Sequence, residues 1–63
     1  MIAHRIDNNI DIIINPSIVD HYCEDWELGG TYIEFNNGWK GLTIKEEFPT
    51  VHHELNKEHY GTT

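Results

Sequence analysis

The chain has 63 residues, of which eleven are Asp or Glu and four are Lys or Arg, so its formal net charge is −7 with neutral histidines. A field of that sign repels nucleic acids and anionic membranes, which excludes direct DNA or RNA binding and attachment through a basic helix. The length predicts one small domain whose core supplies only about 3–5 kcal/mol of net stability. We therefore expect a homodimer, or an obligate partner, as further support.

The use of cysteine and of apolar residues predicts a cytoplasmic protein. Cys23 is the only cysteine, so an intramolecular disulfide is excluded and a reducing compartment is indicated. Asp7 and Asp11 interrupt the segment in which a secretory leader would need an apolar run. The longest purely apolar stretch, Ile12–Ile14, is far too short to span a bilayer. We expect neither a signal peptide nor a membrane span.

The N-terminal part is predicted to form a β-hairpin. Residues 1–7 and 10–15 are rich in isoleucine, which favours strands. Asn8 and Asn9 join them, and asparagine tolerates the positive φ that a tight hairpin turn requires.

A helix is predicted next, because Asn15-Pro16-Ser17 supplies a cap and a proline for its first turn and Gly29-Gly30 supplies its end. Apolar side chains fall on one helical face about 140° wide. They are Ile18, Val19, Tyr22, Cys23 and Trp26. We therefore expect Cys23 and Trp26 to be buried, and Asp20, Glu24 and Glu27 to share the opposite face.

A second hairpin follows over residues 31–35 and 39–44, because Asn37-Gly38 between them is the strongest short-range hairpin signal. Gly41 within its second strand indicates a bulge or a close approach of another part of the chain.

Pro49 opens a final helix that is predicted to reach about Tyr60 and to be closed by Gly61. The predicted fold is α+β, with two β-hairpins and two short helices in ββαββα order. An antiparallel sheet would pack on the helices.

Histidine and cysteine supply candidate metal ligands without a recognisable motif. His21 and Cys23 are two residues apart, so they could share a metal only if their segment were extended rather than helical. A small metal-binding domain is kept as an alternative, and no cofactor is assigned. Its ligands would be Cys23, His21 and one of His52, His53 or His59.

Catalysis is not predicted. Cys23 is followed by Glu24 and Asp25, which would raise the pKa of its thiol rather than activate it. The only serine, Ser17, is explained by its position at a helix start. The sequence contains no glycine-rich phosphate loop, and so short a chain leaves little room for a closed pocket.

The carboxylates are the remaining candidate site, because only four basic residues could neutralise them. Successive helical turns repeat every 5.4 Å, a spacing of the same order as that of phosphates along DNA, so an acidic surface can imitate a phosphate row. The predicted partner-binding residues are Asp20, Glu24, Asp25, Glu27, Trp39, Glu46 and Glu47. Trp39 is included because tryptophan is frequent in interface hot spots and the hairpin turn would expose it.

These features predict a small acidic protein without catalytic activity that binds a basic surface on a larger protein and inhibits or regulates it, partly as a nucleic-acid mimic. The profile resembles that of phage-encoded inhibitors of host defence or nucleic-acid machinery, a resemblance of composition and not of motifs. One alternative is an assembly module that completes a larger complex through its sheet edge or its tryptophans. Another is that the acidity serves only solubility.

Overall fold

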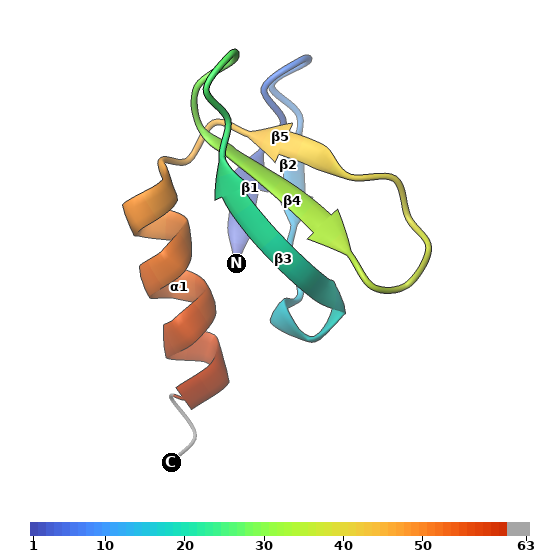
Figure 1. The fold of residues 1–63 in the computed structure, drawn as a ribbon, viewed down its shortest axis with the longest axis vertical. Coiled ribbons are helices and arrows are strands. Elements are labelled where there is room, and N and C mark those ends of the chain that lie inside the picture. The colour runs from blue at the N-terminus through green and yellow to red at the C-terminus, as the bar shows by residue number, and fades with distance from the viewer. Residues whose placement is uncertain (61–63) are drawn as a thin grey trace.

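The structure is a computed structural model that describes the backbone of residues 1–60 and the side chains of residues 1–56. In chain order the elements are β1 (Ile2–His4), β2 (Asp11–Ile13), the short 3-10 helix η1 (Pro16–Ile18), β3 (Val19–Glu24), β4 (Thr31–Phe35), β5 (Leu42–Ile44) and α1 (Phe48–Tyr60) (Figure 1). The predicted combination of antiparallel sheet and helix is confirmed. The ββαββα order with two α-helices is wrong, and the predicted closing residue Gly61 lies outside the described residues.

The segment predicted as the first helix forms only one helical turn, η1, and then continues as the strand β3. The Asn15 side chain does cap that turn, accepting a hydrogen bond from the Ser17 N–H at 3.0 Å, but the backbone becomes extended at Val19. A bulge between Val19 and His21 inserts Asp20 without a partner on β4.

This bulge explains why the segment imitates a helix. Val19 pairs with Phe35 and Tyr22 pairs with Ile33, so residues three apart on β3 share one face of the sheet. A regular strand repeats every two residues, whereas a spacing of three is typical of a helix. The helix-like spacing of apolar residues in this segment therefore results from a bulged strand and not from a helix.

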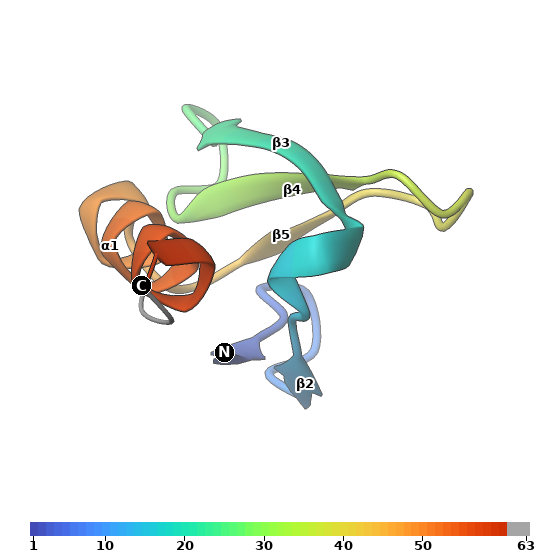
Figure 2. The ribbon, with the colours of Figure 1, turned by 90° about the horizontal axis from the view of Figure 1, so that it is seen from below.

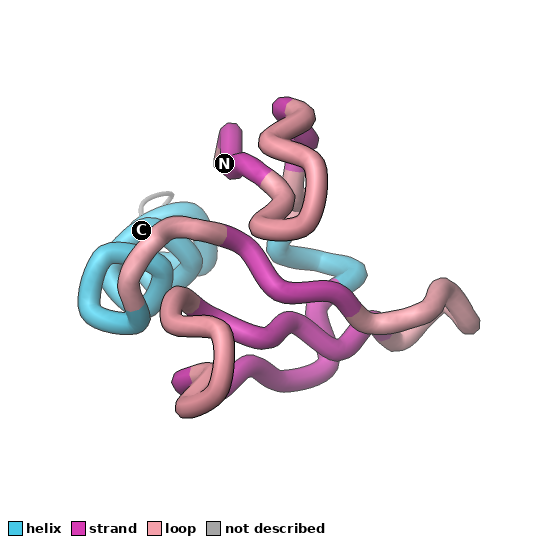
Figure 3. The backbone as a smooth tube through the Cα atoms, turned by 90° about the horizontal axis from the view of Figure 1, so that it is seen from above, coloured by secondary structure: helices cyan, strands magenta, loops and turns pink. Residues whose placement is uncertain are grey.

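Strands β3, β4 and β5 form an antiparallel sheet in that order, and β1 and β2 form a separate hairpin. The chain after β1 runs along the outer side of β5. There Arg5 bridges Ile44, and the Lys45 N–H donates to the His4 carbonyl at 2.8 Å. The edge of β3 that faces away from β4 has no neighbouring segment among the described residues, as Figures 2 and 3 show.

Both predicted hairpins are confirmed, with shorter strands than expected. Ile2 pairs with Ile13 in the first hairpin, and Tyr32 pairs with Thr43 in the second. The first hairpin, the sheet and α1 meet around a small core. Its buried apolar side chains are Ala3, Ile14, Ile33, Ile44, Val51 and Leu55.

The final helix and the close approach at Gly41 are also confirmed. Helix α1 begins at Phe48, one residue before the predicted start. A Cβ at Gly41 would collide with the Tyr32 side chain and with the Ile33 carbonyl, although Gly41 lies just before β5 rather than within it. None of the helices in the described range is long and apolar enough to cross a membrane.

The turn between β3 and β4 offers a matched test of this packing. Gly29 and Gly30 both have positive φ, +81° and +71°, but only a Cβ at Gly30 would collide with the Ile44 carbonyl. We expect Gly29→Ala to lower the free energy of unfolding by about 1 kcal/mol, from the left-handed backbone alone. Gly30→Ala adds a backbone collision and should lower it by about 2–4 kcal/mol. Urea unfolding of both variants measures the difference, and equal losses would contradict the close packing on β5.

Candidate protein-binding surface

The acidic row predicted on a helix lies instead on the open edge of the sheet. Asp20 occupies the bulge of β3 and Glu24 ends the strand, and both residues are exposed. Four residues of extended chain separate their Cα atoms by about 13 Å, at about 3.3 Å per residue. The predicted helical spacing of about 5.4 Å is absent because the segment is a strand, but the two carboxylates still lie along one element.

Asp25 supports the turn that follows β3. Its Oδ1 accepts the backbone N–H groups of Glu27 at 3.1 Å and Leu28 at 2.9 Å, and its Oδ2 accepts the Thr43 hydroxyl at 2.7 Å. The Leu28 N–H first, and then the Thr43 hydroxyl, lower the pKa of this carboxyl. Asp25 therefore joins the β3–β4 turn to β5, and both oxygens of its carboxylate already accept hydrogen bonds within the protein.

Glu46 is engaged in the same way at the start of α1. Its carboxylate accepts the backbone N–H of His4 at 3.0 Å and the Nδ1–H of His4 at 2.7 Å. Partial burial would by itself raise the pKa of Glu46, but these hydrogen bonds outweigh it and the pKa is lowered. The backbone carbonyl of Glu46 accepts the hydroxyl of buried Thr31 at 2.8 Å, so this residue joins the first hairpin, the sheet and α1.

None of the remaining predicted carboxylates pairs with a Lys or Arg among the side chains that the structure describes. Glu27 and Glu47 are exposed, as are Asp20 and Glu24. Within the described side chains, the only ion pair that involves Lys or Arg joins Arg5 to Asp7, at 3.0 Å. Asp20 has the neighbouring His21 as its ion-pair partner among the described side chains, and the Nδ1 of His21 lies 3.0 Å from its Oδ2. These four carboxylates therefore keep their negative charge exposed to a partner.

The aromatic and cysteine predictions have mixed outcomes. The predicted exposure of Trp39 is confirmed: it is 63% exposed in the β4–β5 loop, with its ring edge-on to Phe35 at 6.0 Å between centroids. Burial of Trp26 and Cys23 is wrong. Trp26 is 86% exposed in the β3–β4 turn, and Cys23 is exposed on β3, because no helix exists to turn them toward the core.

A groove that no sequence pattern predicts runs between β3 and α1. It has a volume of about 150 Å³, and its lining residues are Pro16, Val19, Asp20, Tyr22, Leu55 and Asn56. Tyr22 on β3 contacts two residues of α1. Its hydroxyl lies 2.9 Å from Nδ1 of His52, and its ring centroid lies 5.6 Å from that of Phe48. The groove exists because β3 and α1, which are far apart in the sequence, lie beside each other in the fold.

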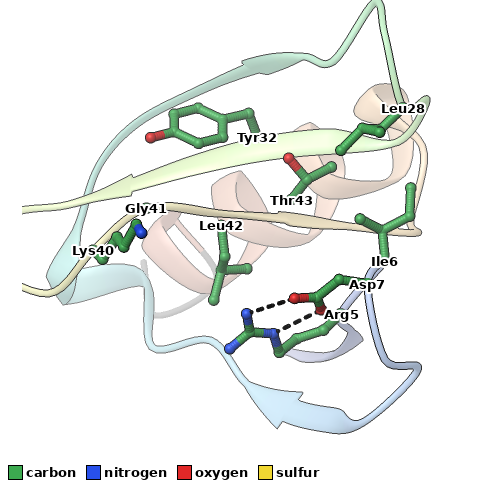
Figure 4. Close-up of a pocket in the computed structure, with 9 residues that line it drawn as sticks. All are labelled: Arg5, Ile6, Asp7, Leu28, Tyr32, Lys40, Gly41, Leu42 and Thr43. Atoms are coloured by element: carbon green, nitrogen blue, oxygen red, sulfur yellow. Dashed lines mark hydrogen bonds and ion pairs between the residues drawn. The ribbon is translucent and has the colours of Figure 1, made fainter.

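A larger and more enclosed hollow of about 370 Å³ lies between the first hairpin and the β4–β5 face (Figure 4). Arg5 and Lys40 both line it. Two hydrogen bonds from Arg5 to Asp7, at 3.1 and 3.0 Å, already occupy one side of the guanidinium. Asp7 therefore neutralises Arg5, and Lys40 supplies the remaining positive charge of this hollow.

The extended β3 places His21 and Cys23 on one face, as a shared metal would require. Among the side chains that the structure describes, no three of His, Cys, Asp and Glu gather closely enough to hold a metal ion. His52 contacts the Tyr22 hydroxyl instead, and the side chain of His59 lies outside the described residues.

No protein-family model matches this chain, and neither a curated protein nor a solved structure matches it. The site must therefore be interpreted from its own geometry.

The contact between His4 and Glu46 predicts a pH dependence of stability. The hydrogen bond to Glu46 is the largest cause that raises the pKa of His4 above 6.5, so the protonated ring is favoured in the folded state. The resulting stability is present below pH 6.5 and is lost as the pH rises through the higher, folded-state pKa. We expect the melting temperature of the native protein to exceed that of His4→Gln by more at pH 6 than at pH 8.5. A difference that is constant across this window would contradict the assignment.

Asp25 and Glu27 are adjacent carboxylates that the structure assigns to different roles. We expect Asp25→Asn to lower the midpoint of urea unfolding, because an amide is a poorer acceptor for the turn N–H groups and the Thr43 hydroxyl. Glu27→Gln makes the same change in net charge without losing such contacts, so its midpoint should match that of the native protein. Equal effects of the two variants would show that charge alone, rather than these hydrogen bonds, is responsible.

Proposed function

We propose that this protein binds a basic surface on a larger protein and inhibits or regulates it without catalysing a reaction, presenting carboxylates partly as a nucleic acid presents phosphates. The observation that carries the proposal is the set of exposed carboxylates that have no Lys or Arg partner among the described side chains. Its members are Asp20, Glu24, Glu27 and Glu47.

The excess negative charge of this protein favours its association with a positively charged partner. At a formal net charge of −7 the folded chain experiences self-repulsion, which cations on a partner would relieve. Complementary fields also accelerate encounter and reject partners of like charge. Salt screens such contacts over about 8 Å at physiological ionic strength, so binding of this kind must weaken as salt rises.

The mimic component of the proposal rests on the edge strand. The separation of about 13 Å between the Cα atoms of Asp20 and Glu24 is close to the axial rise of four nucleotides of a DNA strand, at about 3.4 Å each along the helix axis. A protein that grips a nucleic-acid backbone with regularly spaced cations could therefore engage both carboxylates at once. Such a target would bind this protein and DNA in competition.

The test uses immobilised protein, bacterial lysate and elution by a salt gradient, with excess duplex DNA in a parallel column. We expect retention of a basic, nucleic-acid-binding protein that elutes with salt and is lost when DNA is present. Neutralising the carboxylates in the triple variant Asp20→Asn, Glu24→Gln and Glu27→Gln should weaken binding about tenfold or more, from three exposed charge contacts of about 0.5 kcal/mol each.

A matched control separates local carboxylates from overall charge. The triple variant Thr50→Lys, His53→Lys and Ile10→Lys raises the net charge by the same three units and keeps the four carboxylates. It should retain the partner more strongly than the neutralised variant does. Equal weakening would mean that net charge, and not this surface, determines binding.

A second candidate, an assembly module, is favoured by exposed apolar side chains on the first hairpin. Ile2 and Ile13 lie directly opposite each other and are 68% and 80% exposed. A partner that covers them would be bound by the hydrophobic effect, which salt does not weaken. Retention that ignores both salt and DNA would therefore favour assembly and contradict the mimic.

A further inference from the structure

The open side of β3 is the longest unpaired strand edge in the described chain. β3 has six residues and stands at the end of its three-stranded sheet. Figures 2 and 3, which view the molecule from opposite sides, both show no segment beside its outer side. Alternate backbone N–H and C=O groups of such an edge have no sheet partner and can pair with an added strand.

The groove beside this edge gives an added strand side-chain contacts as well. Val19, Tyr22 and Leu55 are apolar side chains that line the groove between β3 and α1, and Asp20 and Asn56 are its polar lining residues. The contact of Tyr22 with His52 holds the strand against the helix without any ligand. The groove is therefore already formed and needs little reorganisation on binding.

Charge decides which segment fits this edge. If two copies of β3 paired antiparallel about Tyr22, Asp20 of each copy would lie opposite Glu24 of the other. Like charges directly opposite in a sheet are destabilising, whereas opposite charges stabilise the pair. The edge therefore rejects a second copy of this chain and favours a basic segment.

The alternation along β3 defines the pattern of that segment. Tyr22 and Glu24 pair with Ile33 and Thr31, two alternate residues of β4, so they share the face that carries the groove. Asp20 in the bulge lines the same groove. A partner strand would place an apolar side chain opposite Tyr22, with a basic side chain two residues before it and another two residues after it.

We propose that β3 receives an extended segment of the partner as an added strand, with the pattern basic–x–apolar–x–basic, its apolar side chain lying in the groove between β3 and α1. This inference rests on the proposed function and specifies how the partner is held. Main-chain hydrogen bonds to β3 provide affinity, and Asp20 and Glu24 select the basic side chains.

The experiment uses the full chain and the synthetic peptide acetyl-Thr-Lys-Thr-Val-Thr-Lys-Thr-amide, followed by residue-resolved amide NMR and hydrogen exchange. We expect shift changes and slowed exchange in Val19–Glu24, with further shifts in the part of α1 that faces the groove. N-methylating one alternate set of peptide nitrogens should weaken binding about tenfold or more, because two to three hydrogen bonds of about 1 kcal/mol are lost. Methylating the other set should change the affinity less than about twofold, since those nitrogens point away from β3.

Two variants of the protein complete the test. The double variant Asp20→Asn, Glu24→Gln should weaken peptide binding about fivefold or more, from two charge contacts. Asp7→Asn removes an exposed carboxylate outside β3, one that pairs with Arg5, and should leave the affinity for this peptide within about twofold. Thermal melting of each variant confirms that it is folded.

Three results would overturn the edge pairing: no detectable binding of the peptide, shifts centred outside β3 and α1, or equal loss of affinity on methylating either set of nitrogens. None of them overturns the proposed function, which is tested by the retention of the lysate partner and its loss on neutralising the carboxylates. If that retention is confirmed while the peptide fails, the partner binds the acidic surface without adding a strand.

Discussion

The bulged pairing of β3 with β4 is the constraint on which the rest of the structure depends. Because Asp20 is inserted without a partner, Val19 and Tyr22 both face inward although they are three residues apart. Tyr22 can then contact Phe48 and His52, which positions α1 against the sheet. The same insertion leaves the Asp20 carboxylate exposed at the edge. One local irregularity therefore determines both the packing of the helix and the chemistry of the open side.

The carboxylates divide into two groups according to whether the fold uses them. Asp25 and Glu46 accept hydrogen bonds from segments that the chain must bring together, namely β5 for the first and β1 for the second. Satisfied in this way, they stabilise junctions and offer little to a partner. Among the described side chains, Asp20 and Glu24 make no comparable contact across the fold, so their charge is available. The positions of the negative charges alone would not distinguish these two groups of carboxylates.

The sequence predicted those parts of the fold that depend on local signals. Asn37-Gly38 located the second hairpin and Pro49 located the start of α1 to within one residue. The segment from Val19 to Glu24 was assigned to the wrong element, because a bulged strand and an amphipathic helix place apolar residues at the same spacing. Choosing between them requires knowing that β4 is available as a partner, which is a tertiary property.

The candidate site was predictable in composition but not in organisation. Excess negative charge and the exposure of Trp39 follow from the sequence. The structural use of Asp25 and Glu46 does not, since their partners Thr43 and His4 lie 18 and 42 positions away along the chain. Local sequence patterns do not register contacts over such distances, and the groove between β3 and α1 arises from a contact of the same long-range kind.

The position of Cys23 has a practical consequence for observing this molecule. It is the only thiol in the chain, and it is exposed on β3. A thiol-reactive dye would therefore attach at one site, two residues from both the bulge-adjacent His21 and Asp25 of the turn. The fluorescence of that dye would report directly on whether the edge of the sheet is covered, in a mixture where every other protein is unlabelled.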